Sequence, residues 1–474
     1  MDGFVGRTRE LDLLKGLLDT VEAGGRTGRP GKALLIRGRR RVGKSRLVEE
    51  FVSRSGRPHV FFTAIGGSLT HDLTSFVETL AASDLPANTL AADFVEPRTW
   101  DAAFGLLAQA LPTDAPSVVV MDEMPYLVRE DPTFEGALQK AFDRTLARLP
   151  ILLILIGSDL GMMEELNTYG RPFYQRGTEL VVPPLNPAEV ADMLGLGAAD
   201  AFDAYLVTGG LPLICEEWPD GAGLWDYLAE ALNRPTSALL VSGERALAAE
   251  FPTTARAQDV LGAIGNGERT FSLIARAAGG MSATSLTRAM EILISRRMVA
   301  AELPLSTVPS KLTRYRIEDP YLRFWLSFVR PAIPSIERGR GDLVLASVRS
   351  RWSTWRGRAI EPVVRETLWR LADTHLPTGT DSIGSYWTRT NDPEIDIVGG
   401  DRSPVARRLT AVGSIKWHDE APFDARDLAR LVRHRDQLPG ATPGTMLLAV
   451  SRTGSAVDGI DVLDPAELIT AWPH

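Results

Sequence analysis

The hydrophobic residues in the first part of the chain fall into short continuous runs, separated by segments with helical spacing. The runs are apolar and rich in β-branched residues, as buried strands are, and they occupy residues 33–36, 59–63, 118–121 and 152–156. Between them, segments such as residues 46–52 place apolar side chains at helical spacing. This alternation predicts an α/β fold in which helices cover a parallel sheet.

The pattern becomes helical after about residue 203, which predicts a helical lid. Further on, residues 271–278 predict a short helix closed by a glycine pair, and residues 282–285 open a second helix. The apolar residues expected on one face of this second helix are Leu286, Met290, Leu293 and Ile294. Residues 298–301 and 314–317 then predict two strands of a hairpin. Together these elements predict a winged helix-turn-helix, whose second helix fits a DNA major groove; the alternative is a module that only packs or acts as a lid.

A third pattern begins at about residue 337. Residues 360–368 predict a helix, residues 392–398 a strand that carries acids, and residues 409–417 a strand that ends in a lysine and a tryptophan. Such a mixture is typical of a small α/β domain. The changes of pattern divide the chain into residues 1–202, 203–331 and 337–474.

The turn after the first strand has the full phosphate-binding pattern G-x-x-x-x-G-K-[ST]. It consists of Gly38, Arg39, Arg40, Arg41, Val42, Gly43, Lys44 and Ser45, and Arg46 follows at the start of the next helix. The glycines let backbone N–H groups point at phosphate oxygens, and the helix N-terminus adds positive potential. Lys44 would reach the β- and γ-phosphates, and Ser45 would bind Mg²⁺. We therefore expect ATP and Mg²⁺ as ligands of a P-loop.

Two acids end the run at residues 118–121. Asp122 is expected to help hold Mg²⁺, as a Walker B aspartate does. Glu123 is placed to orient and deprotonate the water that attacks the γ-phosphate. Ser158 follows the run at residues 152–156, where it could contact the γ-phosphate or the attacking water, or simply cap a helix. The second acid favours hydrolysis, because nucleotide binding alone would need only the first.

Other residues are candidates for the edges of this site. Val5, Gly6 and Arg7 precede the first strand and could line the pocket for the base. Arg171 and Arg176 lie in a later segment and could neutralise transition-state charge, in their own chain or in a neighbouring copy. The alternative for both arginines is an ordinary surface position.

Composition and charge narrow the class of protein. The 474 residues are 24% charged and 44% hydrophobic with a net charge of −8, values that are ordinary for a soluble globular protein. Residues 311–358 contain eleven Lys or Arg against four Asp or Glu, a basic block that favours double-stranded DNA as a partner. The single cysteine, Cys215, excludes an internal disulfide framework. With no apolar leader and no long apolar run, we expect a cytoplasmic protein without membrane contact.

The combined motifs resemble a known family. The P-loop, Asp122 with Glu123, and the segments at residues 4–7, 209–212 and 315–325 are similar to those of the archaeal-type ATPases, which are AAA+-like proteins of the STAND clade. This resemblance covers essentially the whole chain. It implies a P-loop sheet, a helical lid with a winged helix, and a third domain with the PD-(D/E)XK restriction-endonuclease fold.

The nuclease pattern implied by this resemblance is incomplete. Its helix glutamate would be Glu361, its aspartate Asp396 and its lysine Lys416, whereas the glutamate of its E-x-K element falls on Ser414. A serine cannot replace a carboxylate on Mg²⁺, because this hard cation prefers anionic oxygen. Glu394 lies two residues before Asp396 and faces the same side of the strand, so that it could partly compensate. We expect at most trace cleavage and a retained surface for binding nucleic acid.

The sequence thus predicts an ATP-hydrolysing switch that binds double-stranded DNA through its winged helix and its C-terminal domain. Nucleotide would change the angle between the ATPase core and the following helical part, and hydrolysis would reset it. Two alternatives stay open: an ATP-gated, metal-dependent DNA nuclease, and a protein-binding regulatory scaffold. Assembly into a homo-oligomer is a further option.

Overall fold

The computed structural model describes residues 4–24, 28–88, 97–158, 160–166, 168–250, 255–267 and 269–473. The chain divides into two compact units, Met1–Pro184 and Leu185–His474. The sequence pattern places its first boundary later, at residue 202. Two helices, α9 (Pro187–Leu194) and α10 (Ala198–Thr208), account for the difference, because they pack with the second unit.

The first unit is built on a sheet of five parallel strands in the order β2-β3-β4-β1-β5. The strands are β1 (Lys32–Arg37), β2 (His59–Thr63), β3 (Ser117–Asp122), β4 (Ile151–Gly157) and β5 (Thr178–Val181). The first four contain the apolar runs of the sequence, so the expected α/β fold is confirmed. Every residue of β3 and β4 is buried, which explains why these strands are continuous apolar runs in the sequence.

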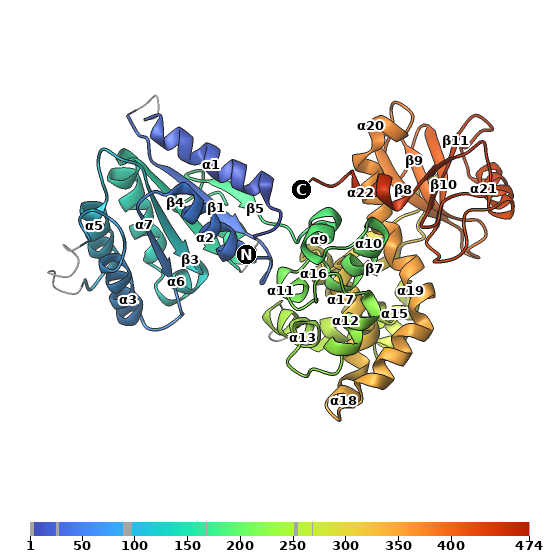
Figure 1. Ribbon diagram of the computed structural model, residues 1–474, viewed down its shortest axis with the longest axis horizontal. Helices are drawn as coiled ribbons and strands as arrows, with labels where there is room; N and C mark the ends of the chain where they lie inside the picture. Colours follow the sequence, from blue (N-terminus) through green and yellow to red (C-terminus); the bar gives the residue numbers. More distant parts are fainter. Residues whose placement is uncertain are drawn as a thin grey trace. The chain divides into compact units, whose positions relative to one another are not determined.

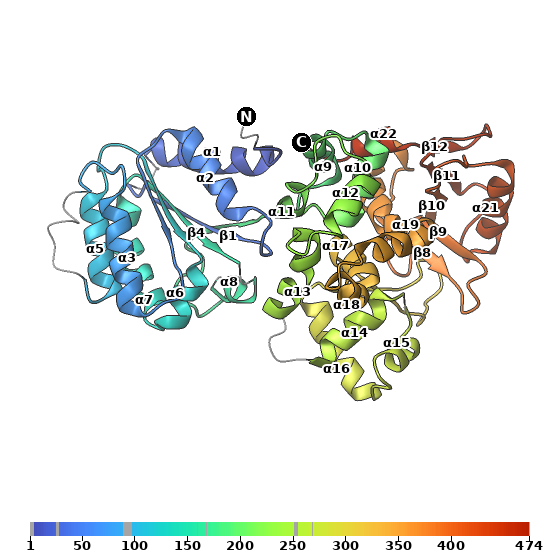
Figure 2. The same ribbon diagram turned by 60° about the horizontal axis from the view of Figure 1, so that its bottom comes forward.

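Helices cover both faces of this sheet. They are α1 (Thr8–Glu22), α2 (Lys44–Ser55), α3 (Leu69–Ala81), α5 (Trp100–Ala110), α6 (Met124–Glu130), α7 (Phe134–Arg144), a 3-10 turn (Leu146–Arg148) and α8 (Leu160–Leu166). Figures 1 and 2 show α1 and α2 on one side of the sheet and α3, α5 and α7 on the other. Aromatic side chains from the second group pack edge to face, with Trp100 in contact with Phe76 and Phe134.

The second unit begins with helices, as the sequence predicts for this part. They are α9, α10, α11 (Pro212–Cys215), α12 (Leu224–Ala231), α13 (Ala238–Glu250) and α14 (Ala255–Gly265). The turn after α10 requires glycine at two positions, because Gly209 and Gly210 have φ values of 61° and 65°. A Cβ atom on Gly210 would also clash with the carbonyl oxygen of Leu185.

A winged helix-turn-helix follows. It consists of α14, α15 (Phe271–Ala277), α16 (Ala283–Ser295) and an antiparallel hairpin of β6 (Val299–Glu302) and β7 (Arg314–Ile317). Leu286, Met290 and Leu293 form the buried face of α16 as expected. The placement of Ile294 on that face is wrong: its side chain is 39% exposed, because it lies beyond the edge of the buried stripe.

The segment between β6 and β7 packs against the C-terminal domain. Leu305 is completely buried in a cluster with Ile395, Val398 and Leu409. Its backbone N–H donates to the Ser385 carbonyl oxygen at 2.8 Å. The wing is therefore part of a domain interface within the second unit.

Short helical segments lead from the hairpin to a long helix. They are α17 (Pro320–Phe324), η2 (Trp325–Val329), η3 (Arg330–Ala332) and α18 (Ile333–Ile336), and after them come α19 (Gly341–Arg370) and α20 (Ala372–His375). The helix expected at residues 360–368 is thus the last third of the 30-residue α19, which continues through Pro362.

The C-terminal domain has a mixed sheet in the order β12-β11-β10-β9-β8. Its elements are β8 (Ser382–Trp387), β9 (Glu394–Gly400), β10 (Leu409–Lys416), α21 (Ala425–Gln437), β11 (Met446–Ser451), β12 (Asp461–Leu463) and α22 (Pro465–Ile469). The strands β8, β9 and β10 are antiparallel, whereas β10, β11 and β12 are parallel. Ile360 and Leu368 of α19 pack in one buried cluster with Ile397 of β9.

A buried ion cluster joins three parts of the second unit. Arg356 of α19 is 1% exposed and donates to Asp203 of α10 at 2.8 Å and to Asp419 after β10 at 2.9 and 3.0 Å. Trp417 donates its indole N–H to Asp203 at 3.0 Å. Burial raises the pKa of Asp203, and Arg356 and Arg452 act in the opposite direction. The cluster fixes α19 against the lid and the sheet.

Among the described residues, no helix is both long enough and apolar enough to cross a membrane.

Candidate functional site

The P-loop lies between the end of β1 and the start of α2, as the sequence predicts. Gly43 is the N-cap of α2 with a φ of 86°, and Arg41 also has a positive φ, of 68°. A Cβ atom on Gly38 would lie 2.5 Å from the carbonyl oxygen of Val182, so this position accepts only glycine. The loop therefore curls tightly before the helix, which is the geometry that aims backbone N–H groups at an anion.

Lys44 is folded back along this loop. Its ammonium group donates to the carbonyl oxygens of Gly38 at 2.9 Å and Arg39 at 3.0 Å, and the residue is 5% exposed. Burial lowers the pKa of Lys44 to about 8, although the nearby Glu123 and Asp122 favour the charged form. The structure thus holds a buried cation at the position expected for a phosphate-binding lysine.

Ser45 and Asp122 come together as the sequence predicts for a magnesium site. The Ser45 hydroxyl donates to the Asp122 carboxylate at 2.6 Å, and the backbone N–H of Glu123 donates to the other oxygen of that carboxylate at 2.8 Å. Burial raises the pKa of Asp122 despite these hydrogen bonds. A hydroxyl and a buried carboxylate are oxygen ligands that suit Mg²⁺, so the two residues fit this ion.

Glu123 and Ser158 face each other beside this pair. Because β4 lies between β1 and β3 in the sheet, the end of β4 meets the end of β3 at the same edge. The Ser158 hydroxyl donates to the Glu123 carboxylate at 2.6 Å. Glu123 has a φ of 52°, a left-handed conformation that is uncommon outside glycine. Whether Ser158 contacts the γ-phosphate or the attacking water stays a prediction.

The residues before β1 support the loop. Arg7 is 3% exposed and donates to the Val42 carbonyl oxygen at 2.9 Å. Arg7 and Gly6 both have positive φ values, 62° and 71°. Val5 and Gly6 are partly buried, and their expected contact with the base stays a prediction.

The remaining arginines of the loop differ in their surroundings. Arg40 donates to the Tyr126 hydroxyl at 3.3 Å, and its charge lies near enough to Lys44 to contribute to the lowered pKa of that lysine. Arg46 is exposed and lies 4.0 Å from Glu49 on the same helix.

The two candidate arginine fingers are paired with acids of α7. Arg171 lies 2.7 Å from the buried Glu135, and Arg176 donates to Asp143 at 3.0 Å. A finger role would therefore require one of these ion pairs to break, and the role stays a prediction.

Comparison with known families agrees with this geometry. Residues 4–213 match the family described as the ATPase domain predominantly from Archaea. The first part of this chain is an archaeal-type ATPase domain. Residues 325–428 match a second family, described as archaeal and bacterial proteins of unknown function. The resemblance stated from the sequence is confirmed for the archaeal-type ATPase family, while the STAND clade and the nuclease-like fold stay predictions.

Individual proteins are similar over much of the chain. The uncharacterized protein MJECL04 of Methanocaldococcus jannaschii is 26% identical over 443 residues, which cover 92% of each chain. The structure of the Walker-type ATPase PABY2304 of Pyrococcus abyssi is 20% identical, with 68% of this chain and 96% of that chain covered and a TM-score of 0.46. The ORC2 protein of Aeropyrum pernix is 16% identical, with 74% and 98% covered and a TM-score of 0.48.

The nuclease-like residues beyond the archaeal-type ATPase domain also come together. They line one cavity of ≈ 310 Å³ in the second unit: Glu361, Glu394, Asp396, Ser414 and Lys416. Asp396 accepts hydrogen bonds from the Ile415 N–H at 2.9 Å and the Ser414 hydroxyl at 3.3 Å. Ser414 thus donates a hydrogen bond at the position where the nuclease pattern requires a second carboxylate.

Lys416 and the acids of this cavity are engaged with other charged residues. The Lys416 ammonium lies 2.6 Å from Asp427 of α21. Arg314 of the wing donates to Glu394 at 2.6 Å, and Arg365 lies 3.6 Å from Glu361. Burial and the neighbouring Asp396 raise the pKa of Glu361. Among the described residues, no group of three or more His, Cys, Asp or Glu is placed to hold a metal ion.

The sequence did not reveal these arginine partners. Arg314 and Arg358 belong to the basic block, which we expect to face DNA, but Arg314 is tied to Glu394 instead. Other members of the block are also used inside the protein, such as Arg356 in its buried cluster and Arg330, which donates to the Gln258 carbonyl oxygen. The block is therefore not one continuous basic surface.

Proposed function

We propose that this protein is an ATP-hydrolysing switch that binds double-stranded DNA. Two hydrogen bonds at the edge of the sheet support ATP hydrolysis: Ser45 donates to Asp122, and Ser158 donates to Glu123. A protein that only bound nucleotide would need the first pair, whereas the second holds a carboxylate where a general base is required.

In this mechanism the residues of the loop bind ATP and Glu123 activates water. Lys44 exchanges its two carbonyl partners for phosphate oxygens, and the backbone N–H groups from Gly38 to Ser45 bind the remaining charge. Mg²⁺, held by Ser45 and Asp122, would neutralise charge on the β- and γ-phosphates. Glu123 accepts a proton from the attacking water, and the Ser158 hydroxyl keeps the carboxylate oriented.

The DNA part of the proposal rests on α16. This helix is the second of the helix-turn-helix, and its outer side carries Arg288 with Arg296 and Arg297 at its end, all of them exposed. The wing is held against the C-terminal domain through the buried Leu305, which leaves α16 as the element that supports groove binding. The C-terminal domain would add phosphate contacts.

The switch part concerns the relation between the two compact units. ATP binding changes the P-loop, and we propose that this change alters the arrangement of the second unit relative to the first until hydrolysis resets it. Arg171 or Arg176, from the same chain or from a second copy in a homo-oligomer, would neutralise transition-state charge after its ion pair with α7 breaks.

The test is the ATPase rate of the full chain with and without duplex DNA. We expect turnover that depends on Mg²⁺, stops in Glu123→Gln and changes several-fold when duplex is added. An unmodified chain that releases no phosphate under either condition would contradict the ATPase proposal. A rate that is unaffected by duplex, together with no DNA binding at low salt, would favour a protein-binding scaffold.

We do not propose nuclease activity for the C-terminal domain. Ser414 in place of a carboxylate, Lys416 paired with Asp427, and arginines on Glu361 and Glu394 all count against a metal-dependent cleavage site. A nicking assay in Mg²⁺ or Mn²⁺ should therefore give no more than trace cleavage. Robust cleavage that Asp396→Ala abolishes would overturn this, and Ser414→Glu is the change most apt to restore activity.

A further inference from the structure

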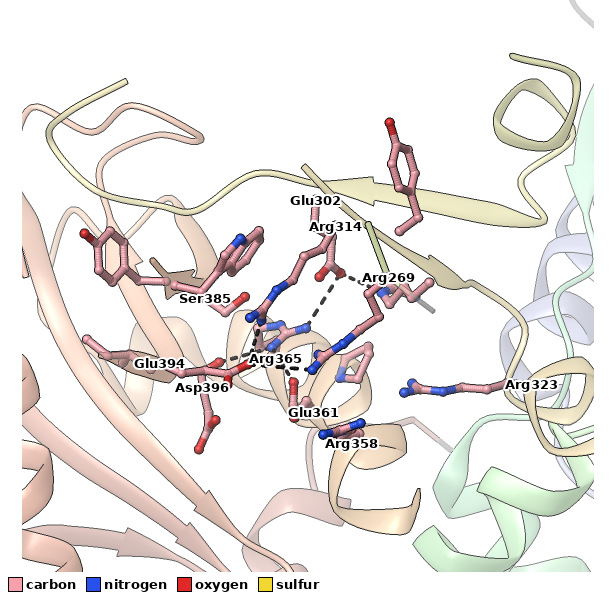
Figure 3. A pocket seen from close by; sticks show the side chains of 16 residues that line it. Arg269, Glu302, Arg314, Arg323, Arg358, Glu361, Arg365, Ser385, Glu394 and Asp396 are labelled. Atoms are coloured by element: carbon pink, nitrogen blue, oxygen red, sulfur yellow. Dashed lines mark hydrogen bonds and ion pairs between the residues drawn. The ribbon is translucent and has the colours of Figure 1, made fainter. Parts of the chain in front are cut away.

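A second cavity of the same unit adjoins the nuclease-like pocket, shares Arg358, Glu361, Glu394 and Asp396 with it, and collects arginines from several elements. It lies where the winged helix, α17 and α19 meet the C-terminal sheet (Figure 3). Its arginines are Arg269, Arg314, Arg316, Arg323, Arg358 and Arg365, and its carboxylates are Glu302, Glu361, Glu394 and Asp396. Six guanidinium groups therefore face four carboxylates around a narrow space of ≈ 30 Å³, and an anion there would offset the excess of positive charge.

Three of the arginines are paired. Arg314 donates to Glu394 at 2.6 Å, and Arg316 donates to Glu302 at 2.5 Å. Arg365 lies 3.6 Å from Glu302 and donates to a backbone carbonyl oxygen of β9. These pairs hold the wing, α19 and the sheet together, and they involve two of the four carboxylates, Glu302 and Glu394.

Arg323 and Arg358 are different. Within the described part of the chain, neither guanidinium forms a hydrogen bond or an ion pair. Figure 3 shows the Arg323 side chain extending from α17 toward the cavity, and Arg358 below Glu361. Burial lowers the pKa of Arg323 to about 10; Glu361 opposes this shift, and the positive charges of Arg316 and Arg269 add to it.

Arg269 completes the group. Its guanidinium reaches only to 4.0 Å from Glu394, an acid that Arg314 already binds more closely. Burial lowers the pKa of Arg269, and the charges of Arg314 and Arg358 act in the same direction. The pKa of Glu361 is raised, so this acid is a weak counter-charge. Arg269, Arg323 and Arg358 thus have unused hydrogen-bond donors and line the same cavity.

We propose that Arg269, Arg323 and Arg358 form a binding site for a phosphate group. Guanidinium groups match phosphate oxygens in pairs of parallel hydrogen bonds, and an anion here would offset the mutual repulsion of the three cations. The site is separate from the P-loop and from α16. It therefore does not depend on ATP hydrolysis or on groove binding by the winged helix.

An adjoining cavity bears on what carries the phosphate. It has a volume of ≈ 380 Å³, and its lining includes Arg316, Arg365 and Trp369. The Trp369 side chain is 55% exposed, which is unusual for so large an apolar group. Exposed aromatic rings beside arginines are a platform for unpaired bases. The phosphate would then belong to a nucleotide or to the end of a nucleic-acid strand, whereas a free phosphate would leave Trp369 unused.

The first experiment measures pyrophosphate binding by titration calorimetry in the full chain carrying Lys44→Ala, so that the P-loop does not bind the probe. We expect measurable binding at low salt. Arg323→Gln and Arg358→Gln, each added to Lys44→Ala, should weaken it at least tenfold, whereas Arg338→Gln, which removes an exposed arginine outside the cavity, should not. Arg358 is exposed and unpaired, so its variant should fold even if the Arg323 variant does not.

The second experiment identifies the source of the phosphate. A short single strand with a 5′-phosphate is compared with the same strand ending in a 5′-hydroxyl, before and after Trp369→Ala. If the strand with the 5′-phosphate binds more tightly, and Trp369→Ala abolishes this difference, the ligand is a nucleotide or a strand end. If pyrophosphate binds but the 5′-phosphate does not tighten binding of the strand, the ligand is a free phosphate. The proposal is overturned if pyrophosphate does not bind to Lys44→Ala, or if adding the Arg323 or the Arg358 change leaves its affinity unchanged.

Discussion

At the level of single residues, Glu123, which we propose as the general base, has a strained backbone. Its φ of 52° costs of order 1–3 kcal/mol for a non-glycine residue. Such a conformation persists only where the surroundings require it, and here α6 begins immediately afterwards at Met124, with Pro125 in its first turn. The strained backbone and the Ser158 hydrogen bond together fix the direction of the carboxylate.

This geometry predicts different effects for substitutions at Glu123 and at Ser158. Glu123→Gln should bind ATP with nearly unchanged affinity and lower kcat by about 10²-fold or more, because the amide cannot accept the proton. Ser158→Ala should lower kcat by roughly tenfold, the effect of removing one hydrogen bond to a charged group. Phosphate-release rates with ATP-binding titrations measure both. Wild-type turnover in Glu123→Gln would mean that another residue is the base.

Lys44 gives a prediction about pH. In the free protein its pKa is about 8, so the ammonium loses its proton above that pH. Bound phosphates favour the charged form, so that above pH 8 binding must take up a proton. ATP affinity should therefore be constant below pH 8 and fall by up to about tenfold per pH unit above it.

Titrations from pH 7.5 to 9.5 test this point. Lys44→Arg is the control, because a guanidinium stays charged throughout this range. An affinity that does not change over the range in the unmodified chain would show that the pKa of Lys44 is not lowered.

At the level of elements, the sequence was sufficient for four of the five strands of the ATPase sheet, and β5 was not predicted. The strands β1 to β4 are continuous apolar runs, and a parallel sheet brings their carboxyl ends to one edge, so that Lys44, Asp122 and Ser158 could be placed together in advance. The length of α19 could not be foreseen in this way. Pro362 is compatible with the first turn of a helix that begins near residue 360, whereas the structure continues the helix through it.

The sequence also could not predict which charged residues from distant parts of the chain form ion pairs. The pairing of Arg171 with Glu135, and of Arg314 with Glu394, depends on which elements pack together and not on local spacing. The same holds for Lys416, whose acid partner Asp427 comes from the following helix.

The second helix of the winged helix-turn-helix, α16, carries the prediction for DNA. Charge reversal at Arg288 and Arg296 should weaken duplex binding and reduce the slope of log affinity against log salt, by about one unit for each arginine that no longer binds a phosphate. Fluorescence anisotropy over a range of salt concentrations measures both quantities. Arg338→Glu is the control for a change of net charge alone. An equal weakening in both variants would show that binding depends on overall charge and not on α16.

The buried cluster around Arg356 carries a prediction for stability. Removing this cation with Arg356→Ala leaves Asp203 buried without its main partner, which should cost about 3–5 kcal/mol of unfolding free energy. Thermal unfolding measures the change. Arg340→Ala is the matched control, because Arg340 forms an exposed pair with Asp342 and should have little effect. Similar small decreases in unfolding free energy in Arg356→Ala and Arg340→Ala would mean that the cluster does not hold α19 in place.

At the level of the whole molecule, we propose that one event, the binding and hydrolysis of ATP, couples two compact units. The ATPase domain contains the P-loop, Asp122 and Glu123, and the second unit contains α16, the arginine cavity and the altered nuclease-like pocket. A switch requires that the nucleotide state changes the affinity for DNA, because two sites are coupled only if each alters the binding free energy of the other.

The most direct test is the duplex-DNA Kd of Glu123→Gln, measured by fluorescence anisotropy with saturating ATP, with ADP and without nucleotide. This variant holds ATP unhydrolysed, so that each state can be measured at equilibrium, and Lys44→Ala shows what the same additions do when the P-loop is disabled. We predict that the Kd with ATP differs from that with ADP by about tenfold, or about 1.4 kcal/mol of coupling, and that the difference disappears in Lys44→Ala. The same Kd in all three states of Glu123→Gln would contradict a nucleotide-controlled DNA switch.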